Sequence, residues 1–322
     1  MFAPNVASND TYERKSPSQP RVDVALFGTA AFSSYLEQIK LAIEDKEMTV
    51  ELQERRAEEV VEGQNGMDED EAAWQRADVK EAKEAKEAIV ALQQLYDDVE
   101  KGWENIDDRV LGYVRFSPPI QFGAGLNKYT RDYALVEIDR SKIDAASFTG
   151  NAINLGTEIT PNEFKRLMFP SPENHHTFKY PKDRLFRVRG TVPDEEMRRP
   201  TIVDQNGDPC LTVMKRGGTT GLTVGRANDV LSYVRNYCAD GDTQISREWA
   251  IFAYDSKPGP FSAEGDSGAA IVDCFGRLGG LLTGGAGITG SPDVTYATPA
   301  SFILDSLEAN GYKVAVEAAL GA

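Results

Sequence analysis

The chain has 322 residues, of which 51 are acidic and 35 are basic, so its formal net charge at pH 7 is −16. This length allows two modest domains or one larger domain with insertions, and a hydrophobic content of 41% is enough for a packed core. The acidic balance argues against nucleic acid or an anionic membrane surface as a partner, because both require an excess of Lys and Arg. No apolar run approaches the length of about 18 residues that a transmembrane helix needs, so we expect no membrane partner.

The start of the chain is polar. Residues 1–20 carry three prolines and are predicted to form an irregular arm, and the alternation of apolar and polar residues over 21–28 predicts a strand. No basic segment leads into an apolar one, as it does in a secretory signal. The cysteines are Cys210, Cys238 and Cys274, an odd number that favours free thiols in a reducing compartment over one disulfide plus a free thiol. We therefore favour an intracellular location, which stays open because an N-terminal segment with a signal could be missing.

Residues 33–107 are rich in Glu, Lys, Ala and Gln, and apolar side chains recur there at three- and four-residue steps. A break rich in Gly and acidic residues interrupts this pattern over 63–70. The second run comprises Ile89, Leu92, Tyr96, Val99 and Trp103. Such spacing places one apolar stripe on a helix and predicts an α-helical hairpin. Its charge run is typical of a solvated face, and the alternative is a coiled coil that binds a protein partner.

After residue 108 the pattern changes to short segments rich in β-branched and aromatic residues, separated by Gly, Pro, Asn and Asp. Short strands without helices between them indicate an antiparallel barrel or sandwich. Residues 299–310 are predicted to form a terminal helix. The predicted strands are 109–117, 132–139, 185–192, 210–217, 219–235, 248–254, 268–273, 278–284 and 293–298.

The sequence EGDSGAA, from Glu264 to Ala270, suits a turn that carries a nucleophilic serine. A serine hydroxyl needs a positioned base, and the oxyanion that forms on attack needs backbone N–H donors. Glycines beside the serine allow a tight bend, so the N–H groups of Gly265 and Ser267 can point into one oxyanion hole. The alternative is a simple polar turn between strands. Asp266, if buried there, needs a cationic partner that the sequence does not identify.

GDSGAAIVD, GRLGGLLTGG and VTYATP follow one another ahead of the terminal helix. In this order they resemble the C-terminal barrel of chymotrypsin-like (trypsin-fold) serine peptidases, and MKRGGTTGLTVG resembles an early strand pair of that barrel. The whole set is most similar to an uncharacterised fungal group of this fold that carries a helical insertion. The resemblance implies a mainly β protein with a trypsin-like double antiparallel β-barrel, whose N-terminal barrel is incomplete, and a long α-helical hairpin insertion.

The resemblance also implies a domain organisation. Residues 1–32 and 108–150 form the incomplete N-terminal barrel, and residues 33–107 form the charged helical insertion. Residues 151–184 connect the barrels, and residues 185–322 form the C-terminal barrel with the nucleophile and the terminal helix.

Roles for single residues near the nucleophile follow from the same resemblance. Ser267 is the nucleophile, and the N–H groups of Gly265 and Ser267 form the oxyanion hole. Asp132, in the sequence DYALVEID, orients the base and stabilises its cationic form. The alternative for Asp132 is a residue that caps a turn at the start of a strand. No cofactor and no metal ion are expected.

Substrate-binding roles are implied for five further residues. Phe261 stands six residues before the serine, where trypsin-like members place an acidic residue at the base of the specificity pocket, and this argues against cleavage after Lys or Arg. The edge strand to which a substrate backbone pairs comprises Leu282, Thr283, Gly284 and Gly285.

The catalytic histidine is missing from its expected place. The family order is histidine, aspartate, serine, yet the chain has only His175 and His176, and both follow Asp132. They are interpreted as an exposed loop pair; a rearranged base or a weak metal site is the alternative. Either this sequence starts late, at an internal methionine, or the protein is a genuine pseudopeptidase, and we favour the late start. In both cases the chain as given is expected to be nearly inactive.

Three functions are therefore compared. The first is a serine endopeptidase that hydrolyses peptide or protein substrates through an acyl-enzyme. The second is a non-catalytic module that binds an extended peptide by strand addition. The third is a scaffold in which residues 33–107 bind a partner helix.

Overall fold

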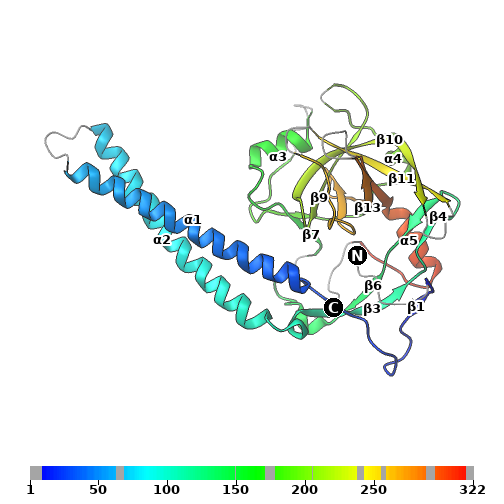
Figure 1. The fold of residues 1–322 in the computed structure, drawn as a ribbon. Coiled ribbons are helices and arrows are strands. Elements are labelled where there is room, and N and C mark those ends of the chain that lie inside the picture. The colour runs from blue at the N-terminus through cyan, green and yellow to red at the C-terminus, as the bar shows by residue number, and fades with distance from the viewer. Residues whose placement is uncertain are drawn as a thin grey trace. The chain divides into compact units, whose positions relative to one another are not determined.

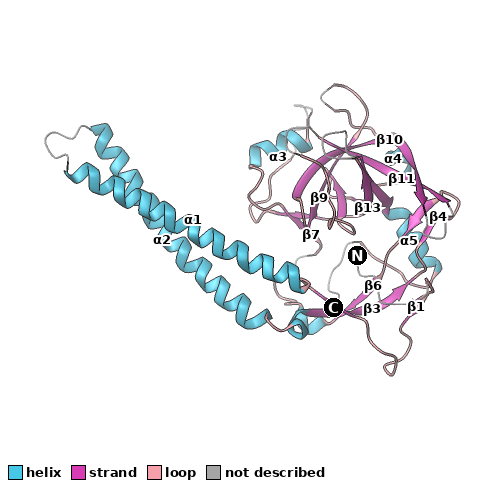
Figure 2. Ribbon diagram, in the orientation of Figure 1, coloured by secondary structure: helices cyan, strands magenta, loops and turns pink. Residues whose placement is uncertain are grey.

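The computed structural model divides into two units, one dominated by strands and one by two long helices (Figures 1 and 2). The strand-rich unit comprises residues 1–19, 115–135 and 143–322, and the helical unit comprises 20–114 and 136–142. The structure describes residues 9–62, 69–148, 150–170, 178–204, 206–237, 243–254, 259–287 and 294–316.

The helical unit contains α1 (Thr29–Glu62) and α2 (Glu69–Trp103), which run antiparallel side by side (Figures 1 and 2). Small and apolar side chains are buried along them, and Gln53 of α1 donates a hydrogen bond of 2.7 Å to Glu81 of α2. The predicted helical hairpin is thereby confirmed. The buried apolar residues are Phe32, Ile39, Ala82 and Ala85.

The first helix begins at Thr29, earlier than the predicted residue 33. The amide of Phe32 already donates to the carbonyl of Gly28, and its ring is buried. The Arg109 guanidinium lies 4.5 Å from the centre of that ring and donates to the Phe27 carbonyl at 2.6 Å. Arg109 ends the 3-10 helix η1 (Ile106–Arg109), so one buried cation joins the two ends of the hairpin.

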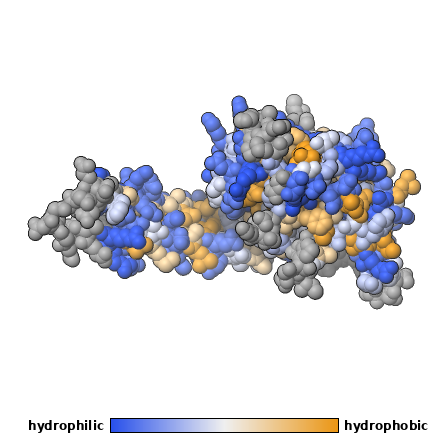
Figure 3. Space-filling view, turned by 90° about the horizontal axis from the view of Figure 1, so that it is seen from above, coloured by the Kyte–Doolittle hydropathy of each residue, from blue (hydrophilic) through white to orange (hydrophobic). Residues whose placement is uncertain are grey.

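The surface of the hairpin is charged but carries apolar side chains as well (Figure 3). Exposed ion pairs such as Lys80 with Glu84 contribute little to the free energy of unfolding, because water and salt screen them. Apolar side chains also remain exposed at Leu41, Met48, Val79 and Val90. The binding of a partner helix by this segment stays a prediction.

A small sheet is built around β3 (Val110–Ser117), which pairs with β1 (Tyr12–Glu13), β2 (Asp23–Ala25) and β6 (Leu135–Ile138). The three strands expected in the N-terminal barrel are thus all present, and β1 adds a fourth. The 3-10 helix η2 (Arg140–Lys142) follows β6.

Residues 121–131 differ from the expectation, because they extend the sheet of the C-terminal barrel. β4 (Gln121–Ala124) pairs with β5 (Tyr129–Arg131), and β5 pairs in parallel with β11 through Tyr129 and Arg247. Thr130 explains this attachment, because its hydroxyl bonds the buried carboxyl of Glu248 and its carbonyl accepts from Thr298. Local strand propensity could not show which sheet these strands would join.

The C-terminal barrel closes on itself. Among the described residues its strands are β9 (Leu211–Gly217), β10 (Gly221–Tyr237), β11 (Thr243–Ala253), β12 (Ala270–Asp273), β13 (Leu278–Ala286) and β14 (Val294–Pro299). Neighbours are antiparallel, and the order β9-β10-β11-β14-β13-β12 returns to β9. Because β12 returns beside β9 after three consecutive antiparallel strands, the connection is a Greek key. The barrel expected from the resemblance to trypsin-fold peptidases is confirmed.

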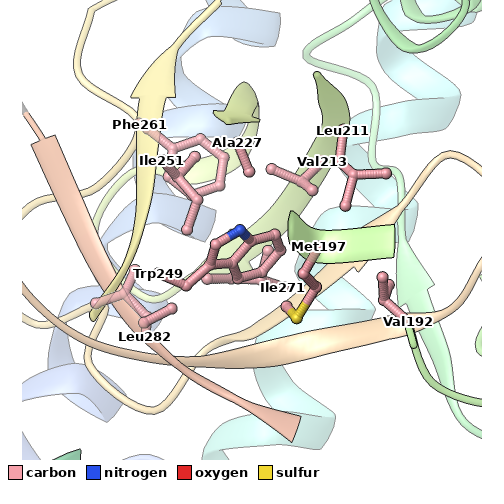
Figure 4. Packing of buried hydrophobic residues seen from close by; sticks show 11 residues of the cluster. Val192, Met197, Leu211, Val213, Ala227, Trp249, Ile251, Phe261, Ile271 and Leu282 are labelled. Atoms are coloured by element: carbon pink, nitrogen blue, oxygen red, sulfur yellow. The ribbon is translucent and has the colours of Figure 1, made fainter. Parts of the chain in front are cut away.

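The barrel core surrounds Trp249, whose side chain is 1% exposed (Figure 4). Val213, Ile251, Ile271 and Leu282 reach it from four different strands. Closure joins the barrel strands in a ring around this core, and removal of the apolar side chains from water is the main term that stabilises the barrel.

Alternation along β9 separates the inside of the barrel from its outside. Leu211 and Val213 belong to the core around Trp249, whereas Met214 belongs to a second buried cluster outside. Lys215 therefore falls on the inward side, although it is charged.

The second cluster covers the outer face of β9 and β12. It joins Met214 and Val272 to Phe164 of α3 (Pro161–Met168) and Phe186 of β8 (Leu185–Arg187), which pairs with β7 (Ala152–Asn154). The described residues of the predicted connection 151–184 therefore contribute to a packed cluster.

Two further helices pack on the barrel. Arg277 joins α4 (Asp194–Arg198) to the sheet, because its guanidinium bonds Glu196 at 2.7 Å as well as Asp273. The predicted terminal helix is α5 (Ala300–Ala309), which buries Ile303 and Leu307.

The described cysteines agree with the prediction of free thiols. Cys210 and Cys274 are free and buried, and burial raises their pKa to about 11 and about 12. Cys238 lies outside the described residues. Within the described ranges, no helix has both the length and the apolar character needed to cross a membrane.

Gly279 provides a test of the barrel core. A Cβ at this position would lie 2.6 Å from the Trp249 ring, so Gly279→Ala should lower the free energy of unfolding by about 1–3 kcal/mol. Gly284→Ala on the same strand is the matched control, because no atom lies within 4 Å of the added Cβ. Urea unfolding followed by circular dichroism measures both, and equal effects would contradict the packing described here.

Candidate functional site

The turn from Glu264 to Gly268 precedes β12 and carries Ser267 at its bend. Gly265 has φ of 98° and Gly268 has φ of 84°, backbone conformations that residues with a Cβ rarely adopt. The amide of Asp266 donates to Ala263 at 3.1 Å, and the carbonyl of Asp266 accepts from Ala269 at 3.0 Å. The tight bend predicted for the motif is therefore present.

The side chain of Asp266 fixes this turn from the inside. One carboxylate oxygen accepts from the backbone N–H groups of Thr219 at 2.8 Å and Thr220 at 3.3 Å. The other accepts from the Thr220 hydroxyl at 2.6 Å, the Ala263 N–H at 3.1 Å and Lys215 Nζ at 3.0 Å. Lys215 is the cationic partner that the sequence did not identify.

The electrostatics of this pair follow from its burial, since both side chains are 0% exposed. Burial raises the pKa of Asp266, but hydrogen bonds from Thr220, Thr219, Ala263 and Lys215 outweigh it and lower the pKa to about 2. Burial also lowers the pKa of Lys215, and the hydrogen bond and charge of Asp266 oppose this shift. Each group therefore has its counter-charge and further hydrogen-bond partners in place, as a buried ion pair requires.

Ser267 is half-buried, while Gly265 and Gly268 on either side are exposed. Within the described part of the chain, the Ser267 hydroxyl has no hydrogen-bond partner, and neither do the N–H groups of Gly265 and Ser267. The next amide, that of Gly268, donates to the Leu282 carbonyl at 2.7 Å. The two amides proposed for the oxyanion hole are thus available, and their role stays a prediction.

The strand β13 runs directly beside this turn. Leu282 also donates to the Ala269 carbonyl at 3.0 Å, and its side chain belongs to the barrel core. Beyond it, Gly284 and Gly285 pair with β14, and the Thr283 hydroxyl bonds the Tyr296 carbonyl at 3.2 Å. Pairing of β13 with β12 ends at Leu281, so in the described chain the other edge of residues 283–285 carries no strand.

The side chain of Phe261 belongs to the barrel core. Its ring is 1% exposed and packs inside the barrel with Ala227 and Ile251 (Figure 4). Gly225 explains this placement, because a Cβ there would lie 2.7 Å from the ring. The role of Phe261 in binding substrate stays a prediction.

The polar groups near Phe261 were missed by sequence reasoning. The hydroxyls of Ser262 and Thr295 are bonded at 2.6 Å, and Thr223 donates to the Phe261 carbonyl at 2.7 Å. Ser262 directly follows Phe261 in a segment without regular secondary structure, so no periodic pattern could predict its contact with Thr295.

Asp132 lies in the coil between β5 and β6 and is half-buried. Burial raises the pKa of its carboxyl. The neighbouring Tyr133 packs with α5, where its hydroxyl lies 2.6 Å from that of Ser306. The role of Asp132 in orienting a base stays a prediction.

The two histidines, His175 and His176, lie outside the described residues. Among the residues that are described, no group of three or more His, Cys, Asp or Glu side chains could hold a metal ion.

Comparison with protein families and with curated proteins gave no match. Among solved structures, the chain is similar to a chymotrypsin from Cellulomonas bogoriensis, with 24% identity and a TM-score of 0.24 over 33% of this chain and 50% of that one. It is also similar to a glutamic-acid-specific serine protease that utilises a histidine triad in substrate binding, with 16% identity and a TM-score of 0.32 over 65% of this chain and 81% of that one. The chain thus matches half the length of the chymotrypsin. Neither likeness assigns a residue of the site, and the trypsin-like fold rests on the strand order of the barrel.

The bend at Gly265 can be tested by substitution. Gly265→Ala should lower the free energy of unfolding by about 1–3 kcal/mol, because its φ is 98° and the new Cβ would lie 2.5 Å from Thr219 Oγ1. Gly268→Ala meets no atom within 4 Å, so it should lose less. Adding Thr219→Ala should recover part of the Gly265→Ala loss only. Chemical denaturation measures these values, and identical losses at the two glycines would refute the close contact.

Proposed function

We propose that this chain is a serine-endopeptidase-type protein, in which Ser267 acts on peptide bonds through an acyl-enzyme. The observation that supports this most directly is the Ser267 hydroxyl, which lacks a hydrogen-bond partner among the described residues and is flanked by two equally available amides. These three groups lie together at a bend whose carboxylate, that of Asp266, is buried and hydrogen-bonded.

In the proposed reaction, Ser267 Oγ adds to the carbonyl carbon of the substrate while its proton passes to a base. The N–H groups of Gly265 and Ser267 stabilise the negative oxygen that forms. The C–N bond of the adduct then breaks as the base protonates the leaving amine, which leaves an ester on Ser267. Water gives a proton to the base and adds to the ester carbonyl, and the bond from this carbon to Ser267 Oγ breaks as Oγ takes the proton back. Asp132 would hold the base in the tautomer that accepts the proton.

How active the chain as given should be depends on how much the missing base contributes to the rate. No histidine precedes Asp132 in this sequence. Loss of the histidine in subtilisin costs about 10⁶ in turnover, or about 8 kcal/mol, whereas one oxyanion donor contributes only about 3–4 kcal/mol. We therefore propose that the chain as given is nearly inactive.

Substrate would bind as an extended peptide along residues 283–285 of β13. This edge lies beside the turn that carries Ser267, since Gly268 bonds the Leu282 carbonyl. Main-chain hydrogen bonds at a strand edge hold a peptide in register and need no particular side chain. A scissile carbonyl could then lie next to the Ser267 hydroxyl.

Chemical rescue by imidazole tests the reaction on the chain as it exists. A fluorophosphonate should label Ser267 slowly, and free imidazole should raise the labelling rate by about tenfold or more, because it supplies the absent base. Peptide mapping by mass spectrometry locates the label.

Ser267→Ala should abolish the label, and Asp132→Asn should reduce the rescue without reducing the slow labelling in its absence. Ser262→Ala is the matched control, because this nearby hydroxyl is already bonded to Thr295. Labelling distributed over several serines, or no labelling with imidazole present, would count against the proposal.

A non-catalytic peptide-binding module is the second candidate, favoured by the free edge of β13 together with the missing base. It predicts that Ser267→Ala leaves the dissociation constant of an extended peptide unchanged. Gly284→Trp should weaken binding, because the Cβ at this position points into open space that a peptide would use. Fluorescence anisotropy with a peptide library measures both, and a library without any binder would exclude this module.

A further inference from the structure

Four acidic side chains are buried in the described part of the chain, and three of them are paired with a cation. The pairs are Asp204 with Arg226, Asp266 with Lys215 and Asp273 with Arg277. The fourth is Glu248 of β11, which is 3% exposed and forms no ion pair with a described residue. A buried carboxylate without a cation loses its hydration and gains no counter-charge, so its neutral form is favoured.

The Glu248 carboxyl lies beside two hydroxyl groups, those of Thr130 and Ser246. The Thr130 hydroxyl donates to the carboxyl oxygen Oε1. The other oxygen, Oε2, and the Ser246 hydroxyl are both buried without a hydrogen bond to a described residue. Ser246 precedes Glu248 by two residues on β11, so both side chains lie on the same face of the strand. A proton on Oε2 would make this oxygen a donor to the Ser246 hydroxyl, and the neutral carboxyl needs no cation.

The surroundings of Glu248 agree with this protonated form. Burial raises the pKa of the carboxyl, and the hydroxyls of Thr130 and Ser246 oppose the rise. The nearest cation in sequence, Arg247, points to the opposite face of β11, where its guanidinium lies 5.7 Å from the centre of the Tyr233 ring. The charged and titratable side chains on the elements packed around Glu248 are Lys128, Tyr129 and Arg131 at β5, Asp229, Tyr233 and Arg235 on β10, Arg247 on β11, Tyr296 on β14, and Asp194 and Arg198 on α4.

The contact between Thr130 and Glu248 also attaches β5 to the barrel. β5 pairs with β11 at a single position, so side-chain contacts contribute much of the attachment. The Thr130 hydroxyl reaches Glu248, and the Thr130 carbonyl accepts from the Thr298 hydroxyl at 2.8 Å. β5 ends at Arg131, and Asp132 directly follows it. The bond to Glu248 therefore lies two residues from the carboxyl that is proposed to orient the base.

We infer that Glu248 is a positioning residue for Asp132: its protonated carboxyl fastens β5 to the barrel through Thr130, and loss of the proton releases β5. The consequence for catalysis rests on the proposed function, whereas the attachment of β5 does not. An ionised Glu248 requires hydration, and displacement of β5 exposes the carboxylate to water. Because the attached form binds the proton more tightly than an exposed glutamate does, attachment is strongest below the ordinary pKa of glutamate and weakens as the pH rises above it.

The test is hydrogen exchange of the amides of residues 121–131 in the full chain, measured by mass spectrometry. Glu248→Gln keeps the shape of the neutral carboxyl, because its carbonyl can accept from Thr130 and its amide can donate to Ser246. At about pH 5 the unmodified protein and this variant should be equally protected. At about pH 8 the unmodified protein should exchange about tenfold faster over these residues, while β9 keeps its protection. Comparison at the same pH removes the intrinsic effect of pH on exchange.

The matched control is Asp229→Asn, which removes an exposed carboxyl from the neighbouring strand β10. This variant should exchange like the unmodified protein at both pH values. Equal protection of the unmodified protein and Glu248→Gln at both pH values would overturn the inference, and so would faster exchange of the unmodified protein at about pH 5.

Thr130→Val covers the case in which Glu248→Gln does not fold, because it removes the hydroxyl and leaves Glu248 in place. It should increase exchange over residues 121–131 at about pH 5. Its effect should be smaller at about pH 8, where the contact is already weakened. Equal effects of Thr130→Val at the two pH values would contradict the attachment proposed for β5.

Fluorophosphonate labelling with imidazole present separates this inference from the proposed function. Glu248→Ala should remove about as much of the rescue as Asp132→Asn does, and Glu248→Gln should keep it. Full rescue in Glu248→Ala would overturn the positioning role. Absence of label on the unmodified chain contradicts the proposed function, while the exchange result still decides whether Glu248 holds β5.

Discussion

The ion pair between Lys215 and Asp266 is the interaction on which the candidate site depends. It joins the wall of the barrel to the turn that carries Ser267, in a place from which water is excluded. A buried pair is costly unless every polar group around it is bonded, and here the threonines at 219 and 220 complete the set. Because the pair is satisfied, the bend can hold two amides and one hydroxyl without partners at its surface.

The closed barrel makes this arrangement possible. Lys215 lies on β9 between β10 and β12. The register of these three strands therefore determines where its backbone lies. The same closure places the Phe261 side chain in the core. The Phe261 carbonyl accepts a hydrogen bond from Thr223, and the Ser262 hydroxyl is bonded to that of Thr295. Two barrel strands thus hold the bend, β9 through Lys215 and β13 through the hydrogen bond from Gly268 to the Leu282 carbonyl.

The helical unit is stabilised by contacts between its own two helices. Its two helices bury small and apolar side chains along their seam, and Arg109 closes the base with a hydrogen bond and a contact with an aromatic ring. The described contacts of this packing lie within the two helices and at their base.

The sequence by itself determined the helical hairpin, the strands of the barrel and the bend at Ser267, because periodicity and glycine placement are local properties. Tertiary structure alone decided that β4 and β5 join the barrel sheet and that Phe261 packs inward, since both depend on contacts between residues far apart in the chain. The partner of Asp266 falls between these cases. Lys215 follows Leu211 and Val213 at the two-residue period of a strand face, so the sequence pattern places it on the inward face. Only the closure of the barrel brings it to Asp266, which is 51 positions away in the sequence.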